Sequence, residues 1–137
     1  MKKIILVSNT AWYIYNFRKL LLEEIVKSGF KLVIVIPYSE VYTEKLKADG
    51  YEIINWDLNR ISINPFSSFI SIFNLLKIYI KEKPDIVNHF TIKPCVIGSL
   101  ISLFLPIKKC VNTIAGIGAW YKNDQIYMRL LLFFINP

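Results

Sequence analysis

Short apolar runs alternate with helical patterns along this chain, and this alternation restricts the folds that it can adopt. The runs at 3–8 and 31–36 have the length of buried strands and are too short for buried helices. The segment 17–25 between them carries apolar residues at helical spacing, with Asn16 as its predicted N-cap. Strands that alternate with helices predict a parallel sheet with helices on both faces.

The same alternation continues through the rest of the sequence. A length of 137 residues suits one compact domain rather than two. We therefore predict a single α/β domain over residues 1–137, with a doubly wound parallel sheet of about five strands. The remaining predicted helices cover 41–48, 66–81, 94–105 and 125–135, and the remaining predicted strands cover 51–56, 85–89 and 109–113.

The predicted helix 66–81, which follows Asn64-Pro65, carries apolar residues around most of its circumference. A helix that is apolar all round is usually a core helix, so burial is the favoured interpretation. The alternative is contact with a membrane surface, with lysines nearby, through four large side chains, Phe66, Phe69, Ile70 and Phe73.

The basic composition invites an anionic partner such as a phospholipid or a diphosphate. The formal net charge is +7 and the isoelectric point is about 9.4. The lysines are dispersed, and neither a basic recognition helix nor an aromatic sheet motif is present, so no nucleic-acid partner is expected. Cys95 and Cys110 lack the spacing and the histidine neighbours of a metal site, so we expect no bound metal and a reducing, cytoplasmic location.

Polar and aromatic side chains gather where the predicted strands end. Open α/β sheets bind ligands at the carboxyl ends of their strands, so these side chains form the candidate site. Aromatic faces, amides and hydroxyls suit a sugar, and an arginine or lysine suits a phosphate. The candidates are Asn9, Thr10, Trp12, Tyr15, Asn16 and Arg18 after the first strand, Arg60 after the third, Thr91 and Lys93 after the fourth, and Gly116 and Gly118 after the fifth.

His89 is the only histidine and therefore the first candidate for proton transfer near neutral pH. The alternative interpretation is a hydrogen-bonded histidine at a strand end. Gly116 and Gly118 have two interpretations as well, because they could bind an anion through their N–H groups or simply let the backbone turn. Neither a G-x-G-x-x-G sequence nor a P-loop is present, so dinucleotide binding and P-loop chemistry are not expected.

Five segments in order carry a resemblance to a known family. They are Ser8 to Tyr13, Asn16-Phe17-Arg18, Arg60 with Ile63-Asn64-Pro65, Lys83 to Pro94, and Asn112 to Gly118. Together they resemble the N-terminal domain of family 4 glycosyltransferases. The resemblance is to bacterial capsule and lipopolysaccharide enzymes that move an N-acetylated sugar from a UDP donor to a polyprenyl-diphosphate-linked acceptor.

This resemblance implies a GT-B architecture, in which two Rossmann-like domains face each other across a cleft. The N-terminal domain binds the acceptor, and transfer needs no metal or other cofactor. It also implies that His89 is the catalytic residue and that the other strand-end candidates contact a lipid-linked saccharide. Similar proteins often carry a second histidine in place of Asn88 and an asparagine in place of Cys95.

The donor-binding half of such enzymes has no counterpart in this sequence. We therefore expect a chain that is inactive alone and that a separate C-terminal donor-binding chain would complete. Its expected location is the cytoplasm, in peripheral contact with the anionic inner face of the plasma membrane. The alternative function is a non-enzymatic, membrane-associated scaffold that recruits a catalytic partner.

Overall fold

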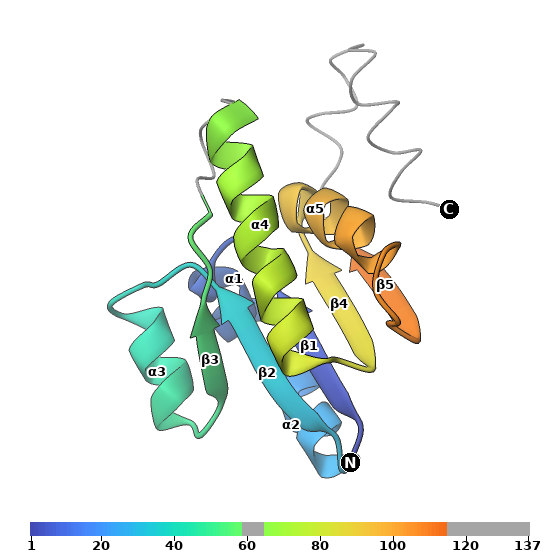
Figure 1. Cartoon of the computed structure of the whole chain (residues 1–137). Helices are drawn as coiled ribbons and strands as arrows, with labels where there is room; N and C mark the ends of the chain where they lie inside the picture. Colours follow the sequence, from blue (N-terminus) through green and yellow to red (C-terminus); the bar gives the residue numbers. More distant parts are fainter. Residues whose placement is uncertain (59–64, 115–137) are drawn as a thin grey trace.

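The computed structural model describes residues 1–58 and 65–114, which form five strands and five helices in a single layered unit (Figure 1). The order along the chain is β1 (Lys3–Val7), α1 (Ala11–Phe17), α2 (Lys19–Lys27), β2 (Lys31–Ile36), α3 (Tyr42–Ala48), β3 (Glu52–Asn55), α4 (Pro65–Glu82), β4 (Ile86–Phe90), α5 (Ile92–Ser102) and β5 (Lys109–Thr113). The predicted helix over 125–135 and the predicted N-cap Asn64 lie outside the described residues.

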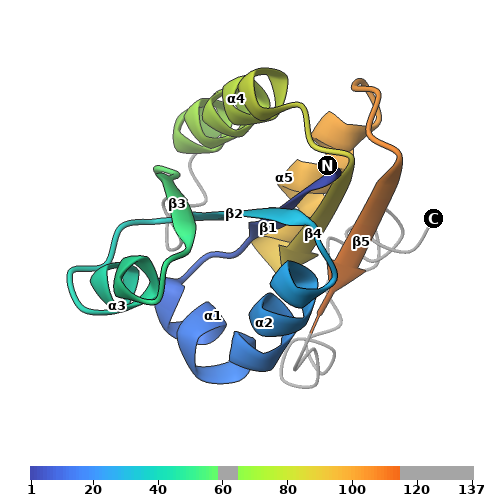
Figure 2. The same ribbon diagram turned by 90° about the horizontal axis from the view of Figure 1, so that it is seen from below.

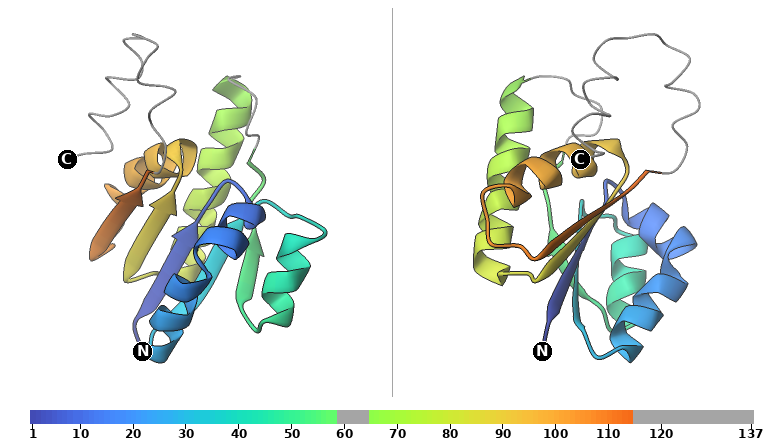
Figure 3. Two further views of the ribbon diagram at one scale, coloured as in Figure 1. Left: turned by 180° about the vertical axis from the view of Figure 1, so that it is seen from behind. Right: turned by 90° about the vertical axis from the view of Figure 1, so that its right-hand side faces the viewer.

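The strands form one sheet in the order β3-β2-β1-β4-β5, and every neighbouring pair is parallel. The helices α1, α2 and α3 lie on one face, and α4 and α5 lie on the other (Figures 2 and 3). This arrangement confirms the predicted α/β fold with a doubly wound parallel sheet.

Alternate side chains of the central strands supply the two halves of the core. Ile5 and Val7 of β1 pack on the side of α4 and α5, while Ile4 and Leu6 pack on the side of α1, α2 and α3. A strand that is buried on both faces needs apolar residues at every position, which explains its continuous apolar sequence.

Helix α1 begins at Ala11, whereas the sequence suggested a loop up to Asn16. Thr10 caps α1, because its Oγ1 accepts a hydrogen bond from the Tyr13 backbone N–H at 3.0 Å. The prediction of Asn16 as an N-cap is therefore wrong. Asn16 lies inside α1, and its Nδ2 donates to the Trp12 carbonyl at 2.9 Å.

Helix α4 is amphipathic in the structure. Ser71, Leu75 and Tyr79 are buried against the sheet. The four large side chains of its first half are 79%, 73%, 56% and 55% exposed in the order Phe66, Phe69, Ile70, Phe73. The favoured prediction of a helix buried all round is therefore wrong for these four side chains. In the described part of the chain, no helix is both long and apolar enough to cross a bilayer.

Candidate functional site

An open pocket of about 490 Å³ lies where β1 and β2 end. We call it the β1–β2 pocket. Three of the predicted site residues line it, all of them from the chain that follows β1. Its lining is Asn9, Thr10, Ala11, Trp12, Pro37, Tyr38, Ser39 and Tyr42.

The local structure after β1 explains how these three side chains reach the pocket. β1 ends at Val7, and buried Ser8 continues the pairing with β2 through its backbone N–H, which donates to the Val35 carbonyl at 3.1 Å. The Ser8 hydroxyl then accepts a long hydrogen bond of 3.4 Å from the Thr10 backbone N–H, one residue before α1 begins. Trp12 lies in the first turn of α1 and is 48% exposed, so its ring is available to a ligand.

The other wall of the pocket comes from the loop after β2, which sequence reasoning missed. Pro37, Tyr38 and Ser39 follow β2 directly, and Tyr42 begins α3. Ligands bind at the carboxyl ends of strands in open α/β sheets, and this principle predicted Asn9 and Thr10. It also predicts Tyr38 and Ser39, because they occupy the same position after the neighbouring strand.

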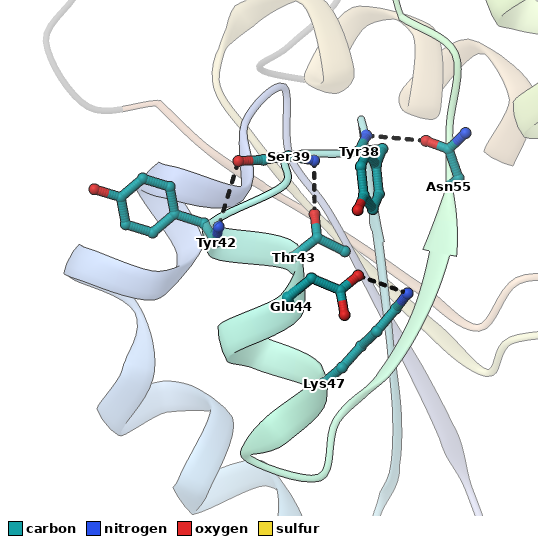
Figure 4. Close-up of polar contacts among 7 residues, drawn as sticks. All are labelled: Tyr38, Ser39, Tyr42, Thr43, Glu44, Lys47 and Asn55. Carbon is teal, nitrogen blue, oxygen red and sulfur yellow. Dashed lines mark hydrogen bonds and ion pairs between the residues drawn. The ribbon is translucent and has the colours of Figure 1, made fainter.

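Hydrogen bonds fix the backbone of this loop (Figure 4). Asn55 Oδ1 accepts from the Tyr38 backbone N–H at 2.9 Å, and Thr43 Oγ1 accepts from the Ser39 backbone N–H at 2.8 Å. The Lys47 Nζ lies 5.8 Å from the centre of the Tyr38 ring. The loop thus presents a phenol ring at a defined position beside the pocket.

Three further candidates after β1 lie outside the pocket lining, namely Tyr15, Asn16 and Arg18. The Tyr15 ring packs against the Tyr42 ring at 5.7 Å, behind the pocket wall. The Arg18 guanidinium lies 5.1 Å from the centre of the Phe90 ring, and its Nη2 donates to the Tyr13 hydroxyl at 2.6 Å. Asn16 is exposed on α1 and hydrogen-bonds within that helix.

The end of β4 brings Thr91 close to this group, since Phe90 and Thr91 are consecutive. Thr91 has a positive φ of 72°, and its Oγ1 is buried without a hydrogen-bond partner, as is Arg18 Nε. Lys93 lies in the first turn of α5, where partial burial lowers the pKa of its ammonium group. β1 and β4 are neighbours in the sheet, so Arg18 and Thr91 lie at the same edge as the β1–β2 pocket.

His89 is fully buried between the sheet and the helices α4 and α5. Its Nε2 lies 2.6 Å from the Tyr79 hydroxyl, and its Nδ1 lies 2.8 Å from Asn112 Oδ1. The Asn112 Nδ2 in turn donates to the Ser99 Oγ at 2.8 Å. An amide oxygen can only accept, so His89 Nδ1 carries the hydrogen and Nε2 accepts from Tyr79.

This network satisfies the neutral imidazole completely. Burial lowers the pKa of His89 to about 4, with a smaller opposing contribution from the hydrogen bond to Asn112. These contacts are those of a hydrogen-bonded core histidine, which was the alternative interpretation. The catalytic role of His89 stays a prediction.

Cys95, on α5, is buried too, and burial raises the pKa of its thiol to about 12. It therefore remains a neutral thiol in the core. Arg60, Gly116 and Gly118 lie outside the described residues. Within 1–58 and 65–114, no three His, Cys, Asp or Glu side chains come close enough together to bind a metal ion.

Comparison with known proteins adds a family and a fold to this geometry. Residues 3–134 match the family model described as glycosyl transferase 4-like. Over 130 residues the chain is 25% identical to the N,N'-diacetylbacillosaminyl-diphospho-undecaprenol alpha-1,3-N-acetylgalactosaminyltransferase of Campylobacter jejuni. That alignment covers 95% of this chain and 34% of the relative, so the chain spans about a third of the relative's length.

Three solved structures with a similar fold are each about two and a half times as long as this chain. MurG of Acinetobacter baumannii superposes with a TM-score of 0.64 at 17% identity, covering 82% of this chain and 34% of MurG. A glycosyltransferase of Rickettsia africae superposes with a TM-score of 0.63 at 19% identity, covering 90% of this chain and 34% of the Rickettsia protein. A putative UDP-N-acetylglucosamine 2-epimerase of Listeria monocytogenes superposes with a TM-score of 0.67 at 17% identity, covering 99% of this chain and 38% of the epimerase. These similarities show the Rossmann-like fold alone.

Proposed function

The chain belongs to the glycosyl transferase 4-like family, and we propose that it is the N-terminal, acceptor-binding half of a glycosyltransferase. In this proposal the complete enzyme moves a sugar from a UDP-sugar to a lipid-linked saccharide during capsule or lipopolysaccharide synthesis. The Campylobacter relative supports this acceptor class, because its name gives a diphospho-undecaprenol-linked sugar as the acceptor.

The observation that carries the proposal is the β1–β2 pocket. It is open, lies at the carboxyl edge of the sheet, and is lined by the rings of Trp12, Tyr38 and Tyr42 together with Asn9 and the hydroxyl-bearing Thr10 and Ser39. Aromatic rings cover the apolar faces of a sugar, while amides and hydroxyls pair with its hydroxyl groups. None of the described lining residues is charged, which suits a neutral sugar.

The proposed enzyme needs a second half for catalysis. The chain corresponds to about a third of its relative, and the part of a GT-B enzyme that binds the nucleotide sugar lies in the other domain. We therefore propose that a donor-binding half completes the cleft and that the 137-residue chain has no transferase activity without it.

We expect the purified chain to bind a lipid-linked acceptor but to give no product from UDP-sugar and that acceptor. Trp12→Ala should weaken acceptor binding up to about tenfold, because it removes an exposed ring whose stacking on a sugar contributes up to about 1.5 kcal/mol. Isothermal titration with a short-chain prenyl-diphosphate saccharide measures binding, and chromatography of the reaction mixture measures product.

The matched control is Leu20→Ala, which truncates a side chain of α2 that is 78% exposed and does not line the pocket. It should bind like the unmodified chain. Turnover by the isolated chain would contradict the inactive-half proposal, and absence of acceptor binding would contradict the assigned function.

The exposed apolar side of α4 supports the membrane contact in this proposal. Phe66, Phe69, Ile70 and Phe73, which we call the α4 apolar patch, border a groove of about 610 Å³ together with Asn74. The Lys77 Nζ lies 4.7 Å from the centre of the Phe73 ring, so a cation borders the patch. Aromatic side chains beside lysine are typical of protein surfaces that bind anionic bilayers. We accordingly propose a peripheral position on the cytoplasmic face of the plasma membrane.

Phe69→Ser with Phe73→Ser should reduce binding to anionic vesicles at least ~10-fold, since each lost phenyl group forfeits up to about 2 kcal/mol of apolar burial. Co-sedimentation with phosphatidylglycerol vesicles measures the bound fraction. Phe104→Ser is the control, because Phe104 is 79% exposed but follows α5 rather than lying on α4. Equal binding by the double variant and the unmodified chain would exclude the patch as the membrane contact.

The same patch is the specific observation behind the second candidate function, a non-enzymatic membrane scaffold. The two functions differ in their use of the β1–β2 pocket. Vesicle binding without any affinity for a saccharide acceptor would favour the scaffold.

A further inference from the structure

A second pocket adjoins the β1–β2 pocket at the ends of β2 and β3. It has a volume of about 430 Å³, and we call it the β2–β3 pocket. Its lining is Pro37, Tyr38, Asn55, Trp56, Asp57, Leu58, Ser67, Ile70 and Ser71. Pro37 and Tyr38 line both pockets, so the loop after β2 is the wall that they share. Each volume lies in the range of small-molecule sites.

The side chains of the β2–β3 pocket suit a neutral ligand with hydroxyl groups. Asp57 is the one charged residue among the described residues that line it. Its Oδ1 accepts a hydrogen bond from Asn55 Nδ2 at 3.3 Å. The Asp57 side chain is exposed, so its Oδ2 can accept a hydrogen bond from a ligand hydroxyl. The carboxylate would repel a phosphate or an acidic sugar, because like charges at close range are unfavourable.

The pocket is built on fixed groups. Trp56 is fully buried beneath it, and its indole N–H donates to the Ser71 carbonyl at 3.0 Å. The Ser71 hydroxyl lies within hydrogen-bond distance of two carbonyls, that of Ser67 at 3.0 Å and that of Asp57 at 3.2 Å. Asn55 connects this side to the shared wall, because its Oδ1 accepts from the Tyr38 backbone N–H (Figure 4). Binding to such a prearranged surface orders few groups.

The two pockets and the α4 apolar patch adjoin one another. Ile70 lines the β2–β3 pocket and also belongs to the α4 apolar patch. The β1–β2 pocket, the β2–β3 pocket and the patch therefore follow one another, each joined to the next by a shared residue.

We propose that the β2–β3 pocket is a subsite for a second, neutral sugar ring of the acceptor, next to the ring held in the β1–β2 pocket. This inference rests on the proposed function and narrows it to an acceptor saccharide of at least two rings. Tyr38 contacts both rings from the shared wall, Asp57 accepts a hydroxyl hydrogen bond from the second ring, and Asn55 is a positioning residue for Tyr38.

The test is a nuclear magnetic resonance titration of the isotope-labelled 137-residue chain with three probes. They are N-acetylglucosamine, its β-1,4-linked disaccharide N,N'-diacetylchitobiose, and glucuronic acid. The disaccharide should shift the amide signals of Thr10 and Trp12 and those of Asn55 and Asp57 with one common dissociation constant. It should bind about tenfold more tightly than the monosaccharide, and glucuronic acid should leave the signals of Asn55 and Asp57 unchanged.

Asp57→Asn keeps the shape and the contact to Asn55 but removes the charge. It should weaken disaccharide binding about fivefold, because a hydrogen bond to a carboxylate is stronger than one to a neutral amide oxygen. It should change monosaccharide binding less than about twofold. Glu23→Gln, a charge removal on exposed α2, is the matched control and should change neither.

A disaccharide that shifts only the β1–β2 pocket signals would overturn the second subsite and leave the proposed function intact. Glucuronic acid that binds at Asn55 and Asp57 as tightly as the neutral disaccharide would overturn the assignment of a neutral sugar. No shift at either pocket with any probe would overturn both the subsite and the proposed function.

Discussion

Gly98→Ala is expected to destabilise the domain by at least ~3 kcal/mol, the upper end of the usual cost of overpacking a core. A Cβ at Gly98 would lie 2.0 Å from His89 Nε2 and 2.2 Å from Cδ2. The imidazole has no room to retreat, because Tyr79 and Asn112 hold its two nitrogens. Alanine favours a helix by about 1 kcal/mol over glycine, so any loss of stability must come from the clash. Urea denaturation followed by circular dichroism measures the change.

Two controls separate this clash from the ordinary effects of a glycine substitution. Gly50→Ala adds a methyl group where no atom lies within 4 Å, so it should cost only the ~1–2 kcal/mol of a positive φ, which is 93° here. His89→Ala removes the atoms that the methyl group would meet, so adding Gly98→Ala to that variant should cost almost nothing. An additive double variant would refute the contact as the cause.

Acidification from pH 7 to pH 4 should lower the free energy of unfolding by about 3 kcal/mol through His89 alone. Its pKa is about 4 in the folded chain, against 6.5 for an ordinary histidine. His89 is therefore protonated below about pH 6.5 in the unfolded chain, but only below about pH 4 in the folded chain. The stabilisation is complete above pH 6.5, falls by about 1.4 kcal/mol per pH unit below it, and is lost below about pH 4.

The sequence makes this measurement clean, because His89 is the only histidine. Most carboxyl groups titrate below about pH 4.5, so the slope between pH 6.5 and 5 belongs to His89. Urea midpoints at half-unit intervals of pH measure it. A His89→Gln variant is less stable throughout but should show a flat profile over this interval. A flat profile in the unmodified chain would mean that the imidazole is accessible to protons in the folded state.

Most of the fold could be predicted from hydrophobic periodicity, because parallel strands are buried on both faces. The apolar runs at 3–8 and 31–36 mark β1 and β2, and Lys109–Thr113 is β5 with the predicted bounds. The exposure of α4 could not be predicted in this way. Its apolar residues surround the helix, and only the packing of Leu75 and Tyr79 on the sheet shows which side is left uncovered.

The candidate site was predicted in part. Asn9, Thr10 and Trp12 line the β1–β2 pocket because they directly follow a strand. The helix α1 was not predicted. Ala11 and Ile14 are its only buried residues, and two apolar positions among polar and aromatic residues are too few to show a helical period. The partners of His89 were beyond prediction, because they come from α4, α5 and β5 and meet it only in the folded chain.

The burial of His89 also affects how the net charge of the protein depends on pH. Histidine is the side chain whose ordinary pKa, about 6.5, lies closest to neutrality. With its pKa lowered to about 4, the only histidine adds no positive charge across the range over which cytoplasmic pH varies. Any attraction of this basic protein to an anionic bilayer would depend on lipid composition and ionic strength, and acidification within that range would not release it.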